Sequence, residues 1–445
     1  MRTLIQDVTA ITLDDQDRIL PHVDIAIDGE AIYAVGDKPA SFIPQTIIPA
    51  GEMMAMPAFF NAHTHAAMTL ERGWAEDLPF ERWLNERIWV AESALEEEDV
   101  YWGAALAAAE MLRAGMVGFA DHYFWMDQVA QVVESSGMKA NLAWCHFGLP
   151  PEQELGRKTF EDTVAFVERW DQGAGGRILA SMGPHSPYMD SPAVLRRFAG
   201  EAQRLGVGAH LHLSESTEQV QDSLDRHGLT PVAQVASTGL FDLPRPALVA
   251  HCNVLQDEDY NILAEKGVFV AHTPKTYQKL AMQMPPILEM IRRKVRVALG
   301  TDGPASNSDL NLLEVMRLAG LYQKGLTADA TVLPVQQLLR LATQASASAL
   351  GFSSSGLLAP GRPADLLLLD TRAPHWLPRH DLAAGVVYTA HPGDVAYVWC
   401  DGQLLYRQGE FLTLDYERIR YEAERRAFRM VGKPMHAMRF TPSGQ

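Results

Sequence analysis

Four short stretches, far apart in the chain, carry side chains that could bind a metal ion and activate water. They are His63-Thr64-His65, His212 with Glu215, His251, and Asp302 in Leu-Gly-Thr-Asp-Gly. Imidazoles and carboxylates bind catalytic divalent ions, and such an ion lowers the pKa of its bound water towards 7. Three imidazoles and one carboxylate suit Zn²⁺, with Fe²⁺ or Mn²⁺ also possible. The sequence therefore predicts a hydrolytic site with one divalent metal.

The spacing of these residues indicates which of them bind the metal. Residues i and i+2 lie on one face of a strand, so His63 and His65 can both point into the site. His210 and His212 form a second such pair, and we choose His212 because it lies nearer the end of the apolar run. The predicted ligands are His63, His65, His212 and Asp302.

The predicted catalytic residues are Glu215, His251 and Asp302. Glu215 is expected to be the general acid, and its alternative role is that of an acid at a helix N-terminus. Asp302 can bind the metal and accept a proton from the water, although Asp-Gly is also a common turn sequence. His251 could orient the water or move protons, or it could be a buried core histidine.

Each of these stretches ends an apolar run that resembles a buried strand. The eight expected strands are Met56–Thr64, Val117–His122, Lys139–His146, Arg177–Pro184, Val207–Leu213, Ala247–His251, Val268–His272 and Arg296–Thr301. Segments with helical spacing, such as Glu98–Ala114, Ser191–Leu205 and Gln256–Lys266, separate many of them. Eight alternating units predict an α/β fold, a (β/α)8 TIM-type barrel whose site lies at the C-terminal strand ends.

The two ends of the chain have a different pattern. Alternating runs at Leu4–Leu13, Val23–Val35, Ala364–Leu369 and Val395–Cys400, with Asp-Gly turns, predict hairpins. We expect a small β-sandwich formed by residues 1–56 and 359–445, with residues 57–358 forming the barrel. The segment Asp415–Met430 is expected to be a solvated surface helix.

Composition narrows the class of protein. The chain has 445 residues and a net charge of -17, which argues against nonspecific nucleic-acid binding. Its three cysteines lie far apart, so neither a disulfide framework nor a thiolate zinc site is indicated. No signal peptide and no apolar run long enough to span a membrane is seen. We expect a cytoplasmic protein that acts on a small molecule, with no nucleic-acid or membrane partner.

Several motifs resemble the amidohydrolase superfamily, and within it the methylthioadenosine/S-adenosylhomocysteine deaminase branch. The motifs are Pro57–Leu70 with Arg72-Gly73, Ala75–Leu78 and Trp83-Leu84; Gly183–Tyr188; and Ala298–Asn307. The resemblance covers nearly the whole chain. It implies the ligand set given above, protonation of a ring nitrogen by Glu215, and orientation or deprotonation of the water by His251. Because related enzymes are often oligomeric, a homo-oligomer is possible.

The resemblance also implies a substrate pocket. His185 would bind the heterocycle, Glu92 would accept hydrogen bonds from sugar hydroxyls with Trp83 nearby, and Ser306 belongs to the last motif. Tyr277 stands where the branch usually has Asn, in a loop expected to line the pocket. Arg157 is a candidate for contacting an amino-acid carboxylate.

We therefore expect hydrolytic deamination of an aminated N-heterocycle, most simply methylthioadenosine or adenosine, with S-adenosylhomocysteine less well supported. Alternatives on the same site are guanine, a pterin, or a triazine losing chloride or an alkylamine. A noncatalytic ligand-binding barrel is an alternative of another class. The His-x-Glu and Pro-Cys-x-x-Cys signature of cytidine deaminases is missing.

Overall fold

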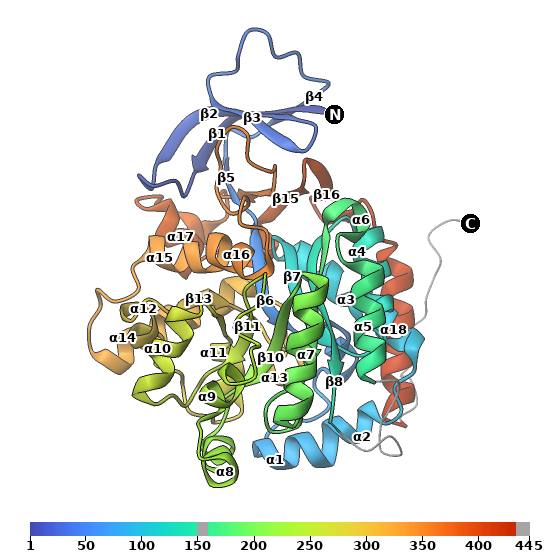
Figure 1. Cartoon of the computed structure of the whole chain (residues 1–445). Helices are drawn as coiled ribbons and strands as arrows, with labels where there is room; N and C mark the ends of the chain where they lie inside the picture. The colour runs from blue at the N-terminus through green and yellow to red at the C-terminus, as the bar shows by residue number, and fades with distance from the viewer. Residues whose placement is uncertain (149–158, 433–445) are drawn as a thin grey trace.

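The computed structural model describes residues 1–148 and 159–432, and its centre is a parallel sheet of eight strands ringed by helices (Figure 1). In order, the strands are β6 (Phe59–Thr64), β7 (Met116–Tyr123), β8 (Lys139–His146), β9 (Ile178–Pro184), β10 (Gly208–Leu213), β11 (Leu248–His251), β12 (Phe269–His272) and β13 (Arg296–Leu299). Nearly every strand residue is buried. Burial on both faces explains why these strands appear in the sequence as apolar runs.

The first and last strands meet and bring the two ends of the sheet together. Just beyond β13, the Thr301 amide donates to Asn61 Oδ1 on β6 at 2.9 Å, and the Asp302 amide donates to the His63 carbonyl at 2.9 Å. Asn61 Nδ2 also donates to Thr301 Oγ1 at 2.7 Å. These bonds give the sheet its barrel form and place Asp302 beside His63.

Amphipathic helices cover the outside of the barrel. The longer ones are α3 (Glu97–Arg113), α4 (Met126–Ser136), α5 (Phe160–Trp170), α7 (Pro192–Leu205), α8 (Thr217–His227), α10 (Asp257–Glu265) and α14 (Leu312–Thr327). Helix α7 shows why the sequence starts and stops them: Ser191 accepts from the Val194 amide at its N-terminus, and Gly206 has φ 74° at its C-terminus.

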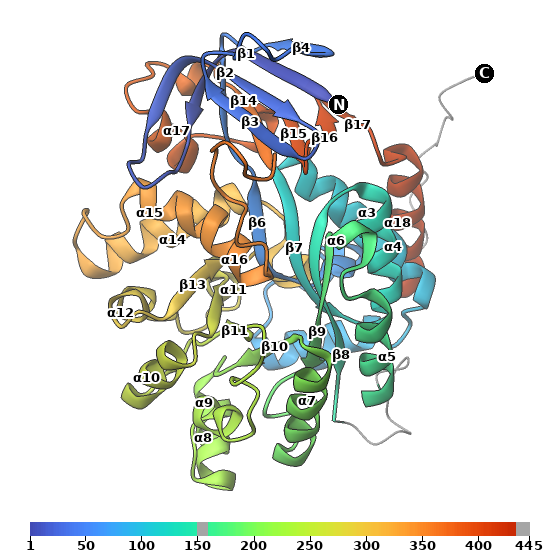
Figure 2. The same cartoon turned by 45° about the horizontal axis from the view of Figure 1, so that its top comes forward.

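A second, mixed sheet is built from both ends of the chain (Figure 2). Its nine strands are β1 (Arg2–Ile11), β2 (Ile19–Asp28), β3 (Ala31–Gly36), β4 (Thr46–Pro49), β5 (Met53–Pro57), β14 (Leu366–Asp370), β15 (Val395–Cys400), β16 (Gln403–Arg407) and β17 (Glu410–Phe411). The two ends join where β5 pairs antiparallel with β14. The predicted fold class is confirmed, whereas the domain limits at 56/57 and 358/359 remain our proposal.

Two sequence predictions about elements need correction. Met56 and Pro57 do not belong to the first barrel strand, because β5 carries them in the nine-stranded sheet opposite Leu367 and Leu366. The C-terminal helix α18 (Tyr416–Met430) is not merely solvated. Its Ile419, Ala423 and Met430 are buried, and Arg426 pairs with the buried Asp99 of α3.

None of the helices in residues 1–148 and 159–432 is both long enough and apolar enough to cross a bilayer.

Candidate metal and active site

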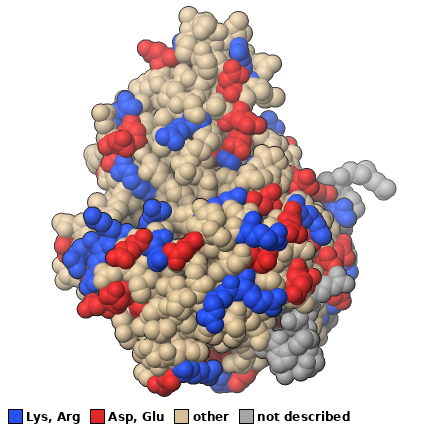
Figure 3. Space-filling view, in the orientation of Figure 1, with Lys and Arg blue, Asp and Glu red and all other residues tan. Residues whose placement is uncertain are grey.

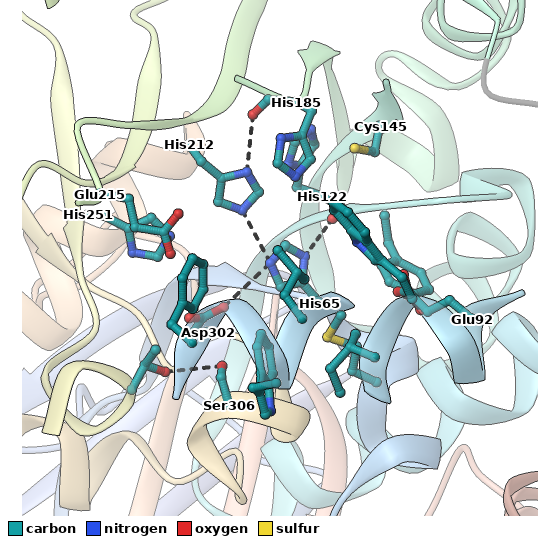
Figure 4. Close-up of a pocket in the computed structure, with 18 of the residues that line it drawn as sticks. His65, Glu92, His122, Cys145, His185, His212, Glu215, His251, Asp302 and Ser306 are labelled. Carbon is teal, nitrogen blue, oxygen red and sulfur yellow. Dashed lines mark hydrogen bonds and ion pairs between the residues drawn. The ribbon is translucent and has the colours of Figure 1, made fainter. Parts of the chain in front are cut away.

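A pocket opens at the C-terminal ends of the barrel strands (Figure 4). Its empty volume is about 670 Å³, which includes space open to solvent. One wall is a helical segment formed by α1 (Phe80–Trp83), a π-helical turn (Leu84–Ile88) and α2 (Trp89–Glu92). Figure 1 places α1 and α2 at the end of the barrel opposite the nine-stranded sheet.

Two histidines at the base of this pocket face each other with their Nε2 atoms. His65 Nδ1 donates to the His122 carbonyl at 2.6 Å, and His212 Nδ1 donates to the His185 carbonyl at 3.1 Å. In each neutral ring Nε2 is therefore an acceptor. The two Nε2 atoms lie 3.3 Å apart, which cannot be a hydrogen bond between two acceptors. Two lone pairs at this distance favour a cation between or beside them.

His63 and Asp302 complete the same cluster. His63 Nε2 and His65 Nε2 lie 3.6 Å and 3.4 Å from Asp302 Oδ1. His63 Nε2 is buried without a hydrogen-bond partner in the described residues, although His63 Nδ1 lies 2.9 Å from His210 Nε2. His210 thus stands behind His63. The donor set His63, His65, His212 and Asp302 fits a divalent metal ion.

Burial keeps the clustered imidazoles neutral. Desolvation lowers the pKa of His63 to about 4, and it lowers the pKa of His210 and His212 well below the ordinary value. Burial would raise the pKa of Asp302, but its interactions with His63 and the other neighbouring imidazoles outweigh burial and lower that pKa. Neutral imidazoles beside an ionised carboxylate are the protonation states that metal binding requires.

Glu215 and His251 lie on the other side of the cluster. His251 Nε2 is 3.6 Å from Glu215 Oε1, and His251, His63 and Asp302 bring their ligand atoms within 4.8 Å of one another. The Glu215 backbone is held by Asn253, whose Nδ2 donates to its carbonyl at 3.0 Å. A carboxyl group and an imidazole are thus available for proton transfer at one edge of the candidate metal site.

The backbone is strained where these strands end. Positive φ angles occur at Ser214 (49°), His251 (82°), Cys252 (51°) and Asp302 (66°). Residues other than glycine rarely adopt this region, and such outliers concentrate at functional sites. The observed strain turns the side chains at the ends of β10, β11 and β13 towards a common centre.

Most of the residues predicted to contact substrate line the pocket, but one of them does not. His185, Trp83, Glu92 and Ser306 line the pocket. Tyr277 does not line it: the ring is fully buried, with its hydroxyl 3.3 Å from His251 Nδ1. The expectation that Tyr277 reaches the pocket is therefore corrected, because the short helix α11 (Pro274–Lys279) turns this side chain beneath His251. Arg157 lies outside the described residues.

Sequence reasoning did not predict the contacts of Glu92. Tyr123 donates its hydroxyl hydrogen to Glu92 Oε1 at 2.6 Å. Glu71, buried with both carboxylate oxygens unpartnered among the described residues, has a pKa raised well above normal by burial and by the charge of Glu92. The sequence signal that could have indicated Glu71 is its position as an acid at the end of the apolar stretch Ala66–Glu71.

Comparison with known proteins agrees with this geometry. Residues 54–405 match the model of the amidohydrolase family. The chain is 42% identical, over 97% of its length and 99% of the relative's, to a 5-methylthioadenosine/S-adenosylhomocysteine deaminase of Pelotomaculum thermopropionicum. A deaminase of the same name from Moorella thermoacetica is 43% identical over 96% of this chain and 99% of the relative.

Solved structures extend the likeness to the whole fold. A zinc-bound adenosine deaminase from Xanthomonas campestris matches with a TM-score of 0.91 and 30% identity, covering 97% of this chain and 98% of that one. An atrazine chlorohydrolase from Arthrobacter aurescens in complex with zinc matches with a TM-score of 0.88 and 25% identity, covering 96% and 100%. The chain belongs to the amidohydrolase family. The predicted resemblance, including the deaminase branch, is confirmed.

Proposed function

We propose that this protein is a metal-dependent hydrolytic deaminase of an aminated N-heterocycle, and that an adenine nucleoside is its substrate. The observation that carries the proposal is the convergence of three histidines and Asp302 on one point, beside Glu215, at the base of a mainly apolar pocket. Full-length relatives named as deaminases of such nucleosides support it.

The proposed metal ligands are His63, His65, His212 and Asp302. Their support is the pair of facing acceptor nitrogens and the unpartnered Nε2 of His63. A bound divalent ion supplies a water of lowered pKa and stabilises negative charge on the oxygen that it contacts. Zinc is our proposed ion, since two similar structures contain it. Iron or manganese would suit the same donors.

The residues around this point have distinct roles in the proposed reaction. Asp302, whose pKa is lowered, is ionised and accepts the proton released as water adds to the carbon bearing the amine. Glu215 donates a proton to the adjacent ring nitrogen. His251 orients the water or carries protons, and the amine leaves as ammonia after protonation. His185, which lines the pocket, contacts the heterocycle.

The far part of the pocket indicates the rest of the substrate. Glu92 accepts from the ribose hydroxyls at the end of α2, with Trp83 and the aromatic residues Trp89, Phe124 and Phe147 around it. Among the described residues, no lysine or arginine lines the pocket. An apolar 5′ substituent suits these walls better than a charged amino acid, which favours methylthioadenosine or adenosine over S-adenosylhomocysteine. Arg157 remains a candidate contact for a carboxylate.

A Glu215→Gln variant tests the central assignment. We expect its turnover of methylthioadenosine or adenosine to fall at least about a hundredfold, because the amide cannot donate the required proton. Its metal content should match that of the unmodified protein. Glu218→Gln, an exposed acid on the following helix, is the matched control and should keep full activity. Full activity of Glu215→Gln would refute the assignment.

Ammonia release from a substrate panel would then identify the heterocycle. The panel contains adenosine, methylthioadenosine, S-adenosylhomocysteine, guanine, a pterin and amino-triazines. The likeness to an atrazine chlorohydrolase makes hydrolysis of a different leaving group the second candidate. Release of chloride or an alkylamine without ammonia would favour it. Cytoplasmic location and homo-oligomeric state stay predictions.

A further inference from the structure

Tyr277 is buried beneath the pocket with its hydroxyl between two groups. The Thr273 amide donates to the hydroxyl oxygen at 3.2 Å, and His251 Nδ1 lies 3.3 Å from the same oxygen. The ring has no exposed surface, so no solvent satisfies the hydroxyl. The position of the phenol hydrogen therefore determines which nitrogen of His251 carries a hydrogen.

Only one arrangement satisfies every group. If the phenol donates to His251 Nδ1, its oxygen still accepts from the Thr273 amide. Every polar atom of this group then has a partner. If His251 Nδ1 donates instead, the phenol hydrogen has no acceptor, because the hydroxyl makes no hydrogen bond among the described residues beyond those with His251 and the Thr273 amide. A buried donor left unpaired loses the hydrogen bond that it would make in water, which destabilises that arrangement. This difference favours the first arrangement.

We propose that Tyr277 is a positioning residue that holds His251 in the tautomer with its hydrogen on Nε2. His251 Nε2 faces Glu215 and the point where the histidines converge. In this tautomer the imidazole presents a hydrogen-bond donor to the reacting groups. It has no lone pair there with which to take a proton or bind a metal. His251 thus orients the attacking water, and proton acceptance is left to Asp302. The tautomer of His251 follows from the structure alone, and only its role in catalysis rests on the proposed function.

The tautomer can be read directly, without measuring turnover. In zinc-loaded protein labelled with ¹⁵N-histidine, correlations from the ring carbon hydrogens distinguish a protonated ring nitrogen from an unprotonated one. The His251 signals are assigned by their loss in His251→Gln. We expect a hydrogen on Nε2 in the unmodified protein and its partial or full transfer to Nδ1 in Tyr277→Phe. A hydrogen on Nδ1 in the unmodified protein, or an unchanged tautomer in Tyr277→Phe, would overturn the proposal.

Kinetics test the consequence. With the preferred substrate, Tyr277→Phe should lower kcat about ten- to a hundredfold, as loss of an orienting partner does at metal sites, while KM changes less than about twofold. Tyr406→Phe, a buried tyrosine of β16 in the other sheet, should leave kcat unchanged. In a His251→Gln background, Tyr277→Phe should cost no further activity.

Two kinetic outcomes oppose the proposal. Unmodified kcat in Tyr277→Phe would show that the hydroxyl has no bearing on the reaction. An equal loss in the His251→Gln background would show that Tyr277 acts through general packing. Where His251→Gln has no measurable turnover, the tautomer measurement decides. If no substrate of the panel is turned over, the proposed function fails while the tautomer assignment is still tested.

Discussion

At the scale of single residues, the pocket pairs polar groups at its base with a carboxylate at its far end. Glu92 is only 7% exposed, accepts from Tyr123 and lies near Glu71, whose pKa is raised well above its ordinary value by burial and by the charge of Glu92. Of these two carboxyl groups only Glu92 lines the pocket, so Glu92 is the one that a ligand hydroxyl can reach. Hydrogen bonds to a charged group contribute about 1.5–3 kcal/mol each.

Replacing Glu92 by Ala separates nucleosides from free bases. We expect kcat/KM for adenosine or methylthioadenosine to fall about a hundredfold, because two ribose hydroxyls lose a charged acceptor. A substrate without a sugar, such as guanine or a pterin, should change less than about threefold. Steady-state ammonia release measures both, and equal losses on the two classes would argue against a ribose pocket.

The buried His272 makes the folded protein less stable as the pH falls. Burial lowers its pKa to about 3, and neither ring nitrogen has a partner among the described residues. At a pH below 6.5, the ordinary pKa of histidine, His272 binds a proton in the unfolded chain but stays neutral in the folded chain. Stability therefore falls as pH drops from 6.5 towards 3, by roughly 2 kcal/mol at pH 5.

Replacing His272 by Leu should remove this contribution. We expect the difference in urea midpoint between pH 7.5 and pH 5 to shrink in His272→Leu. The exposed His380→Leu is the control and should keep the original difference. Identical pH dependence in all three proteins would contradict the burial argument.

At the scale of elements, α18 packs on α3 through a cluster of ion pairs around the buried Asp99, which both Arg426 and Arg429 contact. Arg426 Nη1 lies 2.9 Å from Asp99 Oδ1 and its Nη2 lies 2.7 Å from Glu98 Oε1. Asp99 has no exposed surface and also accepts from the Glu96 amide at the start of α3. Arg426 therefore links the last helix to the cap of a barrel helix.

We expect Arg426→Ala to lower the free energy of unfolding by about 3 kcal/mol, because Asp99 keeps its buried charge with fewer partners. Arg425→Ala, which removes an exposed pair with Glu422, should change it by less than about 0.5 kcal/mol. Chemical denaturation of both variants measures the difference. Similar values would mean that α18 is held by its apolar face alone.

Helices and strands could be predicted from the sequence where successive side chains share one environment. Barrel strands are buried on both faces and end at polar residues, so Lys139–His146 was located without error and β11 within one residue. Met56 and Pro57 were misplaced because an apolar run does not reveal which of two sheets it joins. Tyr277 was misplaced because the direction of a side chain after β12 depends on the turn into α11.

At the scale of the whole molecule, a buried lysine joins the two sheets. Lys139 on β8 is 4% exposed, and its Nζ lies 2.6 Å from both Asp365 and Asp401, which adjoin β14 and β15. Burial alone would lower the pKa of Lys139, but the nearby acidic groups raise it, so the ammonium stays charged. On the outer face seen in Figure 3, by contrast, acidic and basic side chains are interspersed.

Lys139→Met should destabilise the protein by about 3 kcal/mol, since the buried Asp365 and the partly buried Asp401 would lose their counter-ion. Adding Asp365→Asn should restore part of the loss, because one of those charges is then removed. Thermal unfolding of the single and double variants provides the comparison. A single variant as stable as the unmodified protein would show that the ion cluster does not hold the sheets together.

The pairing of β5 with β14 has a consequence for synthesis on the ribosome. Met56 lies opposite Leu367, so the partner of an early strand is translated only after the entire barrel has been made. Strand β5 can pair with β1 on one edge early in synthesis, but its other edge stays open until residues beyond 366 have been made. Truncations that stop short of β14 should therefore leave an unpaired strand edge, a known route to aggregation.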